Sequence, residues 1–296
     1  MSRNTLRTFV FMAALGAVLV AVGNFLGVAL WGPDGRSSGM LIFLGLAAVM
    51  NLGSYWFSDK IVLAMTRARP VAEADAPSLY RTVRNLCAAA NMPMPRLYIM
   101  AAPQPNAFAT GRNPQHAAVA VTEGILEILS EEELSGVLAH ELSHVRNRDI
   151  LIGAVAATVA AAITMLARMA MWGAMFGGGG RDRRDAGPFG ALAWLLSLVL
   201  APIAALLIQM AVSRSREAQA DASGAHLLGD ATPLAQALIK IDGASRRIPQ
   251  LKVNPAVSHL FLCNPLRGGG GLGKLFMSHP PLEERLEQLR KLGARV

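Results

Sequence analysis

The chain has 296 residues and a formal net charge of +8, and 53% of its residues are apolar whereas only 16% are charged. Soluble domains carry about 25% charged residues, so this composition argues against a purely soluble protein. The chain contains no compact module of basic and aromatic residues, and nucleic acid is therefore excluded as the expected partner.

Four long stretches carry no charged residue, and each is long enough to cross a bilayer as a helix of about 20 residues. These stretches are residues 8–33, 37–58, 150–167 and 186–213. The first is too long for the apolar core of a secretory signal, which has about 7–15 residues. One such helix could be buried in a soluble protein, but four predict a mainly α integral membrane protein with the lipid bilayer as a partner.

Basic residues predict how the chain is oriented, because Lys and Arg are enriched on the cytoplasmic side. They precede the first stretch and follow the second, whereas the connection between these two holds only Arg36. We therefore expect a multi-pass protein with its N-terminus and all residues after 59 facing the cytoplasm. The loop "GGGGRDRRDAGP" between the third and fourth stretches is also basic. The second apolar hairpin is therefore expected either to span the membrane or to be only partly embedded.

The part after the second stretch has the pattern of a small domain of helices and strands. A basic helix is expected over 61–70, and apolar spacing predicts a helix over 76–90 and a short one near 124–129. Three strand candidates lie between these two helices: 96–100, 106–110 and 116–122. We expect them to form a small antiparallel sheet, as a hairpin plus one strand.

The next helix begins at Ser130, which forms a Ser-x-x-Glu capping box with Glu133. After the fourth apolar stretch, helices are predicted over 216–228, 232–241 and 281–291. The expected parts are an N-terminal transmembrane hairpin, a cytoplasmic catalytic part, a second apolar hairpin and a second cytoplasmic part. Their bounds are 1–58, 59–149, 150–213 and 214–296.

The capped helix carries the sequence His-Glu-Leu-Ser-His at residues 140–144. Residues four apart lie on one face of a helix, so His140 and His144 can bind one metal ion. In this H-E-x-x-H arrangement the two His bind Zn²⁺ and the Glu, here Glu141, is the general base. The bland alternative is a solvated helix that carries two surface histidines.

A catalytic zinc needs a third protein ligand. The carboxylates Glu217 and Asp221 are four apart on a predicted helix and share a face. One of them can bind the metal, and the other can accept the spare N–H of a ligand His. The alternative is an exposed helix face that pairs with nearby arginines. Because both ends of the second apolar hairpin return to one side, the helices of His140 and Glu217 are expected to be neighbours.

The chain resembles the HtpX family of bacterial heat-shock membrane proteases and, more distantly, the CAAX prenyl proteases of the Ste type. The resemblance is carried by "HELSH" at 140–144, "EAQAD" at 217–221, "NAFATG" at 106–111 and "SHPPLEERLEQL" at 278–289. It implies a gluzincin-like zinc protease domain with one Zn²⁺ per chain, held by His140, His144 and Glu217. It also implies an enzyme of the bacterial inner membrane, facing the cytoplasm, that acts in stress response and protein quality control.

Substrates are then expected to be unfolded or misassembled proteins bound as extended strands. The resemblance implies that the strand at Asn106, with Ala107 and Phe108, forms one wall of the substrate cleft. Asp221 is the expected partner of a ligand His. His279 is either a further group at the site or a loop residue before a helix.

Two other classes of function remain as alternatives. A membrane scaffold with a structural zinc would need a closed set of four ligands, usually with Cys. Neither Cys87 nor Cys263 lies near the motifs. A metal transporter would need ligands inside the spans, and none of the four uncharged stretches contains His, Cys, Asp or Glu.

Overall fold

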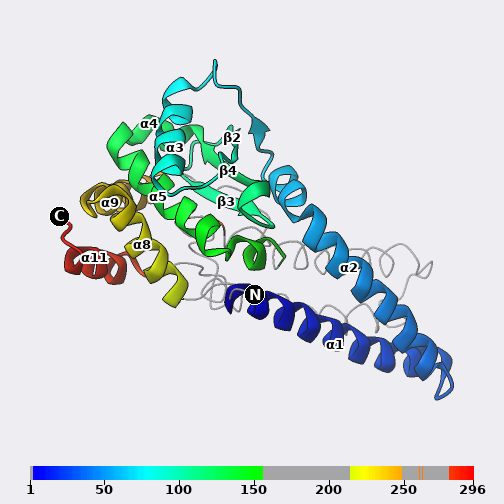
Figure 1. Cartoon of the computed structure of the whole chain (residues 1–296). Coiled ribbons are helices and arrows are strands. Elements are labelled where there is room, and N and C mark those ends of the chain that lie inside the picture. Colours follow the sequence, from blue (N-terminus) through cyan, green and yellow to red (C-terminus); the bar gives the residue numbers. More distant parts are fainter. Residues whose placement is uncertain (1–2, 156–213, 249–259, 261, 263–279) are drawn as a thin grey trace, which may run out of the picture.

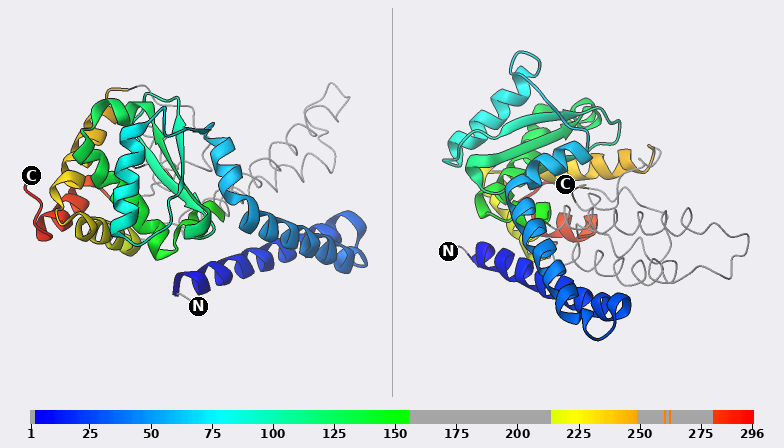
Figure 2. Two further views of the ribbon diagram at one scale, coloured as in Figure 1. Left: turned by 45° about the horizontal axis from the view of Figure 1, so that its top comes forward. Right: turned by 90° about the vertical axis from the view of Figure 1, so that its right-hand side faces the viewer.

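A computed structural model of the chain describes residues 3–155, 214–248, 260, 262 and 280–296. The chain begins with two long helices, α1 (Arg3–Trp31) and α2 (Gly35–Met65). They pack against each other as a hairpin that extends away from the sheet and its covering helices (Figures 1 and 2). The two backbones approach closely at Gly27 and Gly35, where a Cβ on Gly27 would overlap the Gly35 carbonyl oxygen. Small residues allow this kind of close helix contact in membranes.

The hairpin presents large apolar side chains to its surroundings. Leu41, Val49 and Leu52 of α2 are 67%, 69% and 62% exposed. Within the described ranges, α2 is the one helix that is long and apolar enough to cross a membrane. Residues 150–155 begin a further helix. The rest of the predicted second hairpin, up to residue 213, lies outside the described residues.

The predicted basic helix over 61–70 is confirmed only for residues 61–65, which are the end of α2, and is wrong for residues 66–70. α2 continues without a break to Met65 and ends there. Two residues later the backbone of Arg67 is left-handed, with φ of 55°, so the helix does not resume. Arg69–Pro70 then form a short strand, β1, whose Arg69 pairs with Ile99 of β2. α2 is therefore joined directly to the edge of the sheet.

The sheet is mixed, so the prediction of an antiparallel sheet was wrong. Its strand order is β1-β2-β4-β3, with β2, β3 and β4 formed by Arg96–Met100, Ala107–Gly111 and Ala117–Thr122. β3 and β4 form the expected antiparallel hairpin, but β4 lies between β3 and β2 and runs parallel to β2. Strand spacing in the sequence specifies which residues are extended but not which strands become neighbours. β3 is consequently an edge strand of this sheet.

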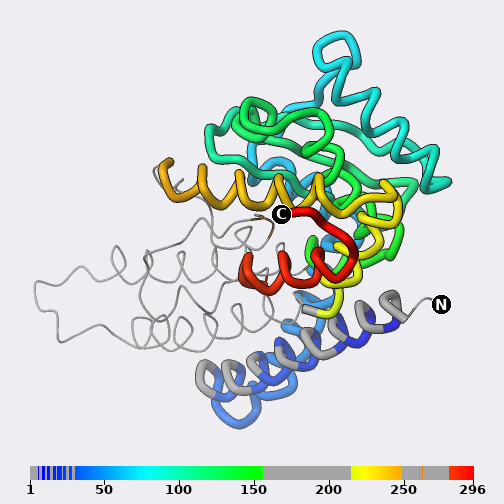
Figure 3. Tube along the Cα trace, turned by 90° about the vertical axis from the view of Figure 1, so that its left-hand side faces the viewer, coloured from blue at the N-terminus to red at the C-terminus, as the bar shows by residue number. Residues whose placement is uncertain are grey.

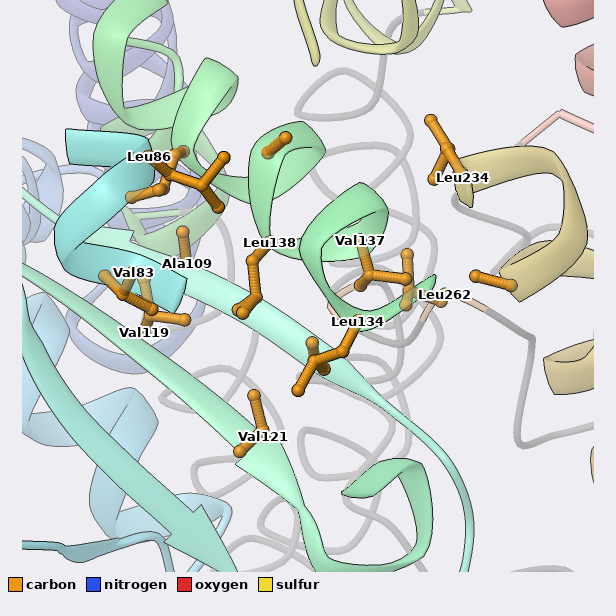
Figure 4. Packing of buried hydrophobic residues seen from close by; sticks show 14 of the residues in the cluster. Val83, Leu86, Ala109, Val119, Val121, Leu134, Val137, Leu138, Leu234 and Leu262 are labelled. Carbon is orange, nitrogen blue, oxygen red and sulfur yellow. The ribbon is translucent and has the colours of Figure 1, made fainter. Parts of the chain in front are cut away.

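The central helix is α5 (Glu131–Asn147), which packs on one face of the sheet. The predicted capping box is present, because Ser130 accepts a hydrogen bond from the Glu133 N–H and Glu133 accepts one from the Ser130 N–H. Figure 4 shows Leu134, Val137 and Leu138 of α5 lying between sheet residues and residues from other elements.

Both faces of the sheet are covered. The helices α3 (Pro77–Ala89), α4 (Glu123–Ile128), α5 and α9 (Thr232–Ser245) contribute to the core on one face. The end of α2 packs on the other face, where Val62 and Leu63 join Phe108. α8 (Arg214–Leu228) lies against α5, and α11 (Leu282–Lys291) lies against α8 and α9, as Figure 3 shows. These helices follow the predicted ranges closely, except that α9 continues four residues further.

Candidate metal centre

Two helices that are distant in sequence supply the polar side chains of the site. α5 supplies His140, Glu141 and His144, and α8 supplies Glu217 and Asp221. The helices approach closely because α8 has Gly224 at the contact, where a Cβ would lie 3.0 Å from the backbone nitrogen of His140. Because the two backbones are close, the side chains of His140 and His144 on α5 and of Glu217 on α8 reach the same point.

The ligand atoms of His140, His144 and Glu217 all lie within 4.8 Å of one another. The two Nε2 atoms are 3.2 Å apart, and the Glu217 oxygens lie 3.7 Å from Nε2 of His140 and 3.6 Å from Nε2 of His144. Two ligand atoms bound to a tetrahedral Zn²⁺ at about 2.0–2.1 Å are about 3.3 Å apart. The three residues therefore fit a zinc ion in spacing and in donor type.

The other ring nitrogens of both histidines contact carboxylates. Nδ1 of His140 lies 2.8 Å from Oδ1 of Asp221, and Nδ1 of His144 lies 3.1 Å from Oδ2 of Asp149. A carboxylate accepts, so each Nδ1 carries a proton, and each Nε2 is the nitrogen that can bind a metal ion when it is deprotonated. Two lone pairs that face each other at 3.2 Å repel unless a cation or a proton lies between them.

The electrostatic surroundings of His144 favour such a cation. Burial would lower the pKa of His144, but the carboxylates of Asp149, Glu217 and Glu141 raise it to about 10. The same carboxylates attract a divalent ion. A proton and a metal ion compete for the same nitrogen, and metal binding therefore releases a proton.

Asp221 is almost completely buried, with 1% of its surface exposed. Its partner besides His140 is Arg285 of α11, whose Nε and terminal nitrogen donate to Oδ2 at 3.0 Å and to Oδ1 at 2.6 Å. Burial alone would raise the pKa of Asp221, but Arg285 and His140 together hold it well below its usual value. Asp221 is therefore ionised and held from two sides.

Glu141 is 5% exposed and points toward the edge strand. Its Oε2 accepts a hydrogen bond of 2.9 Å from the backbone N–H of Ala109. Because Asn106 exchanges hydrogen bonds with Thr122 at the end of β4, alternation along the strand directs the backbone groups of Ala107 and Ala109 away from β4. The Glu141 carboxylate thus lies at the edge of β3 that faces away from β4.

The other residues singled out from the sequence lie in different surroundings. The Asn106 side chain accepts from the Leu262 N–H at 2.8 Å and donates to the Leu260 carbonyl at 3.4 Å. Ala107 faces α5, whereas Phe108 packs on the opposite face with the end of α2. His279 lies outside the described residues.

Two residues of this centre were missed by the sequence reasoning, Asp149 and Arg285. Asp149 is five residues after His144 and would not share its face on a continuous helix. The left-handed backbone of Arg148, with φ of 58°, ends α5 and turns the chain back, so that the Asp149 N–H donates to the His144 carbonyl. Arg285 lies in the motif at 278–289, but nothing local in that motif indicates its partner.

Comparisons with known proteins bear on the whole chain. The model of a family described as Peptidase family M48 matches residues 73–293. A Protease HtpX homolog of Pelotomaculum thermopropionicum is 52% identical over 290 residues, covering 98% of this chain and 99% of that protein. The homolog of Syntrophotalea carbinolica is 55% identical over 290 residues, covering 98% and 99%. The crystal structure of S. mikatae Ste24p is similar with a TM-score of 0.48 and 18% identity, covering 97% of this chain and 65% of that one.

Proposed function

Because the chain belongs to peptidase family M48 and is a metalloprotease, we propose that it is a zinc endopeptidase of the bacterial inner membrane. Its proposed substrates are damaged or misassembled proteins, membrane proteins among them. The observation that carries this proposal is the meeting of His140, His144 and Glu217 at one point, with Glu141 beside them. The alternative, a membrane scaffold with a structural zinc, would need a fourth protein ligand. It would also leave the position of Glu141 beside the ligands unexplained.

The proposed roles at the site follow from the contacts of each side chain. His140, His144 and Glu217 would hold the ion, and Asp221 and Asp149 would fix the tautomers of the two histidines. Bound zinc polarises the scissile carbonyl and lowers the pKa of water toward 7.

Glu141 is the proposed general base. The Ala109 N–H holds one carboxylate oxygen at 2.9 Å, so the carboxylate keeps a fixed orientation and the other oxygen can accept the proton of the attacking water. The same carboxyl group then delivers that proton to the leaving amine.

We propose further that the substrate binds as an extended strand beside β3. This strand is at the edge of the described sheet, and its Ala109 lies against the general base. Backbone pairing gives affinity without strong sequence preference. All five residues of β3 are buried in this structure, so this pairing requires the side chains that cover them to move. In this arrangement Ala107 acts through its backbone, which is directed away from β4, whereas the backbone groups of Phe108 face β4 and its side chain packs behind the strand. His279 is proposed as a further group at the cleft.

The membrane arrangement is proposed from the N-terminal hairpin. Residues 1–58 would form a transmembrane hairpin, and residues 59–149 and 214–296 would form the cytoplasmic parts, joined by a hairpin at 150–213. The exposed apolar side chains of α2 support this. So does the firm junction between α2 and the sheet, where Asp59 pairs with Arg96 at 2.5 Å and Arg112 lies 4.5 Å from the Trp56 ring.

The test uses the purified full chain in detergent with zinc and a disordered protein substrate. Glu141→Gln is expected to keep its zinc and to lose cleavage by at least roughly a hundredfold, the lower range for losing a general base. Glu123→Gln, which changes an exposed acid on α4, is the matched control and should cleave normally. Mapping the cut sites by mass spectrometry gives the cleavage preference. Normal turnover by Glu141→Gln would remove this residue from the mechanism.

A further inference from the structure

The C-terminal helix α11 reaches the metal centre through one side chain. Arg285 is 2% exposed although it lies on a short helix near the end of the chain. In Figure 3, α11 lies beside α8. The Arg285 side chain donates to Asp221 of α8 and lies close to the ring of His140 of α5. Its partner Asp221 is 64 residues away in sequence, and its terminal nitrogen also lies 3.4 Å from Nδ1 of His140, which is 145 residues away.

The geometry joins three groups in series. Arg285 binds both oxygens of Asp221, at 3.0 and 2.6 Å. Oδ1 of Asp221 is in turn 2.8 Å from Nδ1 of His140. A guanidinium fork that holds both oxygens fixes the plane of the carboxylate, which a single hydrogen bond does not do. The plane of Asp221 then sets the direction in which the His140 ring points its Nε2.

We propose that Arg285 is a positioning residue of the metal site, which acts through Asp221 to orient His140 and so makes tight zinc binding depend on the docking of α11. This inference rests on the proposed zinc-dependent function. Arg285 touches neither substrate nor metal in this arrangement. It holds Asp221, the hydrogen-bond partner of His140, and it does so from α11, a helix that contributes no metal ligand.

The chemistry of the contact requires arginine. Lysine would offer a point charge without the planar fork, so it would neutralise Asp221 without fixing its plane. Removal of the positive charge would leave a buried, unpaired carboxylate, which is strongly destabilising. An effect on stability and an effect on metal affinity must therefore be measured separately.

The experiment measures the zinc dissociation constant of the detergent-solubilised full chain by competition with a chelator. Arg285→Met is expected to weaken zinc binding about 10- to 100-fold, the usual effect of losing an outer partner of a ligand. Arg285→Lys should fall between Arg285→Met and the unchanged chain. Arg290→Met is the control, since Arg290 lies on the same helix, is exposed and donates to the Val296 carbonyl.

A double variant separates positioning from folding. Asp221→Asn combined with Arg285→Met leaves no buried unpaired charge, whereas each single variant leaves one, so without zinc the double variant should unfold at a higher temperature than either single variant. If Arg285 acts through Asp221, the double variant binds zinc as weakly as Asp221→Asn and no weaker. This comparison holds even if Arg285→Met alone does not fold.

Two results would overturn the positioning role of Arg285, and a third would overturn the proposed zinc-dependent function. Equal zinc affinity of Arg285→Met and Arg290→Met would overturn the inference, and so would losses from Arg285→Met and Asp221→Asn that multiply in the double variant. Absence of zinc binding by the unchanged chain would instead overturn the proposed function on which the inference rests.

Discussion

Both carboxylate oxygens of Asp149 lie close to Nδ1 of His144, at 3.2 Å for Oδ1 and 3.1 Å for Oδ2. Asp149 is 7% exposed, and it immediately precedes the helix that starts at Ile150. Each of the two histidines therefore has its own carboxylate, Asp149 for His144 and Asp221 for His140. Only the carboxylate of Asp221 is also held by an arginine, among the residues described here.

Replacement of Asp149 by Asn should weaken metal binding while preserving the fold. Asn keeps an oxygen that accepts a hydrogen bond from Nδ1 of His144. It loses the negative charge that makes Nε2 of the imidazole a stronger ligand for the metal. We expect a zinc dissociation constant about 10- to 100-fold higher, measured by chelator competition. Asp75→Asn, at an exposed position, should bind zinc as the unchanged chain does. Unaltered affinity in Asp149→Asn would mean that its contact with His144 does not tune the site.

Glu217→Ala should lose the metal itself. The two histidines alone leave the site one protein ligand short of the three typical of a catalytic zinc. We expect the zinc content after dialysis, measured by elemental analysis, to fall from about one ion per chain to near zero. Glu123→Ala, an exposed acid on α4, should retain its zinc. Full zinc content in Glu217→Ala would take Glu217 out of the ligand set.

Asn106→Ala should destabilise the contact of Asn106, the residue before β3, with Leu260 and Leu262. The Leu262 N–H is buried and donates to the Asn106 side chain at 2.8 Å. A buried donor left without a partner costs about 1–3 kcal/mol. We expect a decrease of this size in the free energy of unfolding, measured by urea titration in detergent. Asn106→Asp keeps the acceptor oxygen but buries a carboxyl group opposite the Leu260 carbonyl, so it should lose at least as much stability as Asn106→Ala. Stability of Asn106→Ala equal to that of the unchanged chain would contradict this account.

The pairing of Glu133 with Lys240 predicts a pH-dependent stability. Burial would raise the pKa of Glu133, but Lys240, whose ammonium lies 2.8 Å away, and the Ser130 N–H bring it below its ordinary value of 4.5. A carboxyl whose pKa is lowered by folding stabilises the protein above its unfolded pKa, and this stabilisation is lost as the pH falls through the folded value.

Glu133→Gln keeps the capping oxygen and removes the charge. The variant should therefore unfold more easily than the unchanged chain at pH 7, by an amount that stays constant down to about pH 5 and shrinks at lower pH. Thermal unfolding over a pH series measures this difference. Glu132→Gln, the exposed neighbour, should show no such dependence. A difference between Glu133→Gln and the unchanged chain that does not shrink at all as the pH falls below 4.5 would argue against the ion pair.

The sequence alone was sufficient for features that depend on local spacing. The helix of His140 and His144, its capping box at Ser130 and the three main strands follow from periodicity and from end signals within a few residues. The shared face of Glu217 and Asp221 follows from the same helical spacing. These features need no knowledge of distant neighbours, and the structure has them close to the predicted bounds.

Apart from the predicted contact between the helices of His140 and Glu217, only the tertiary structure decided which distant groups meet. It places β4 between β2 and β3, which makes the sheet mixed. It turns the chain at Arg148 so that Asp149 reaches His144, and it brings Arg285 to Asp221 across 64 residues. Strand neighbours and buried ion pairs depend on how whole elements pack, and the residues near one partner in sequence carry no signal of the other.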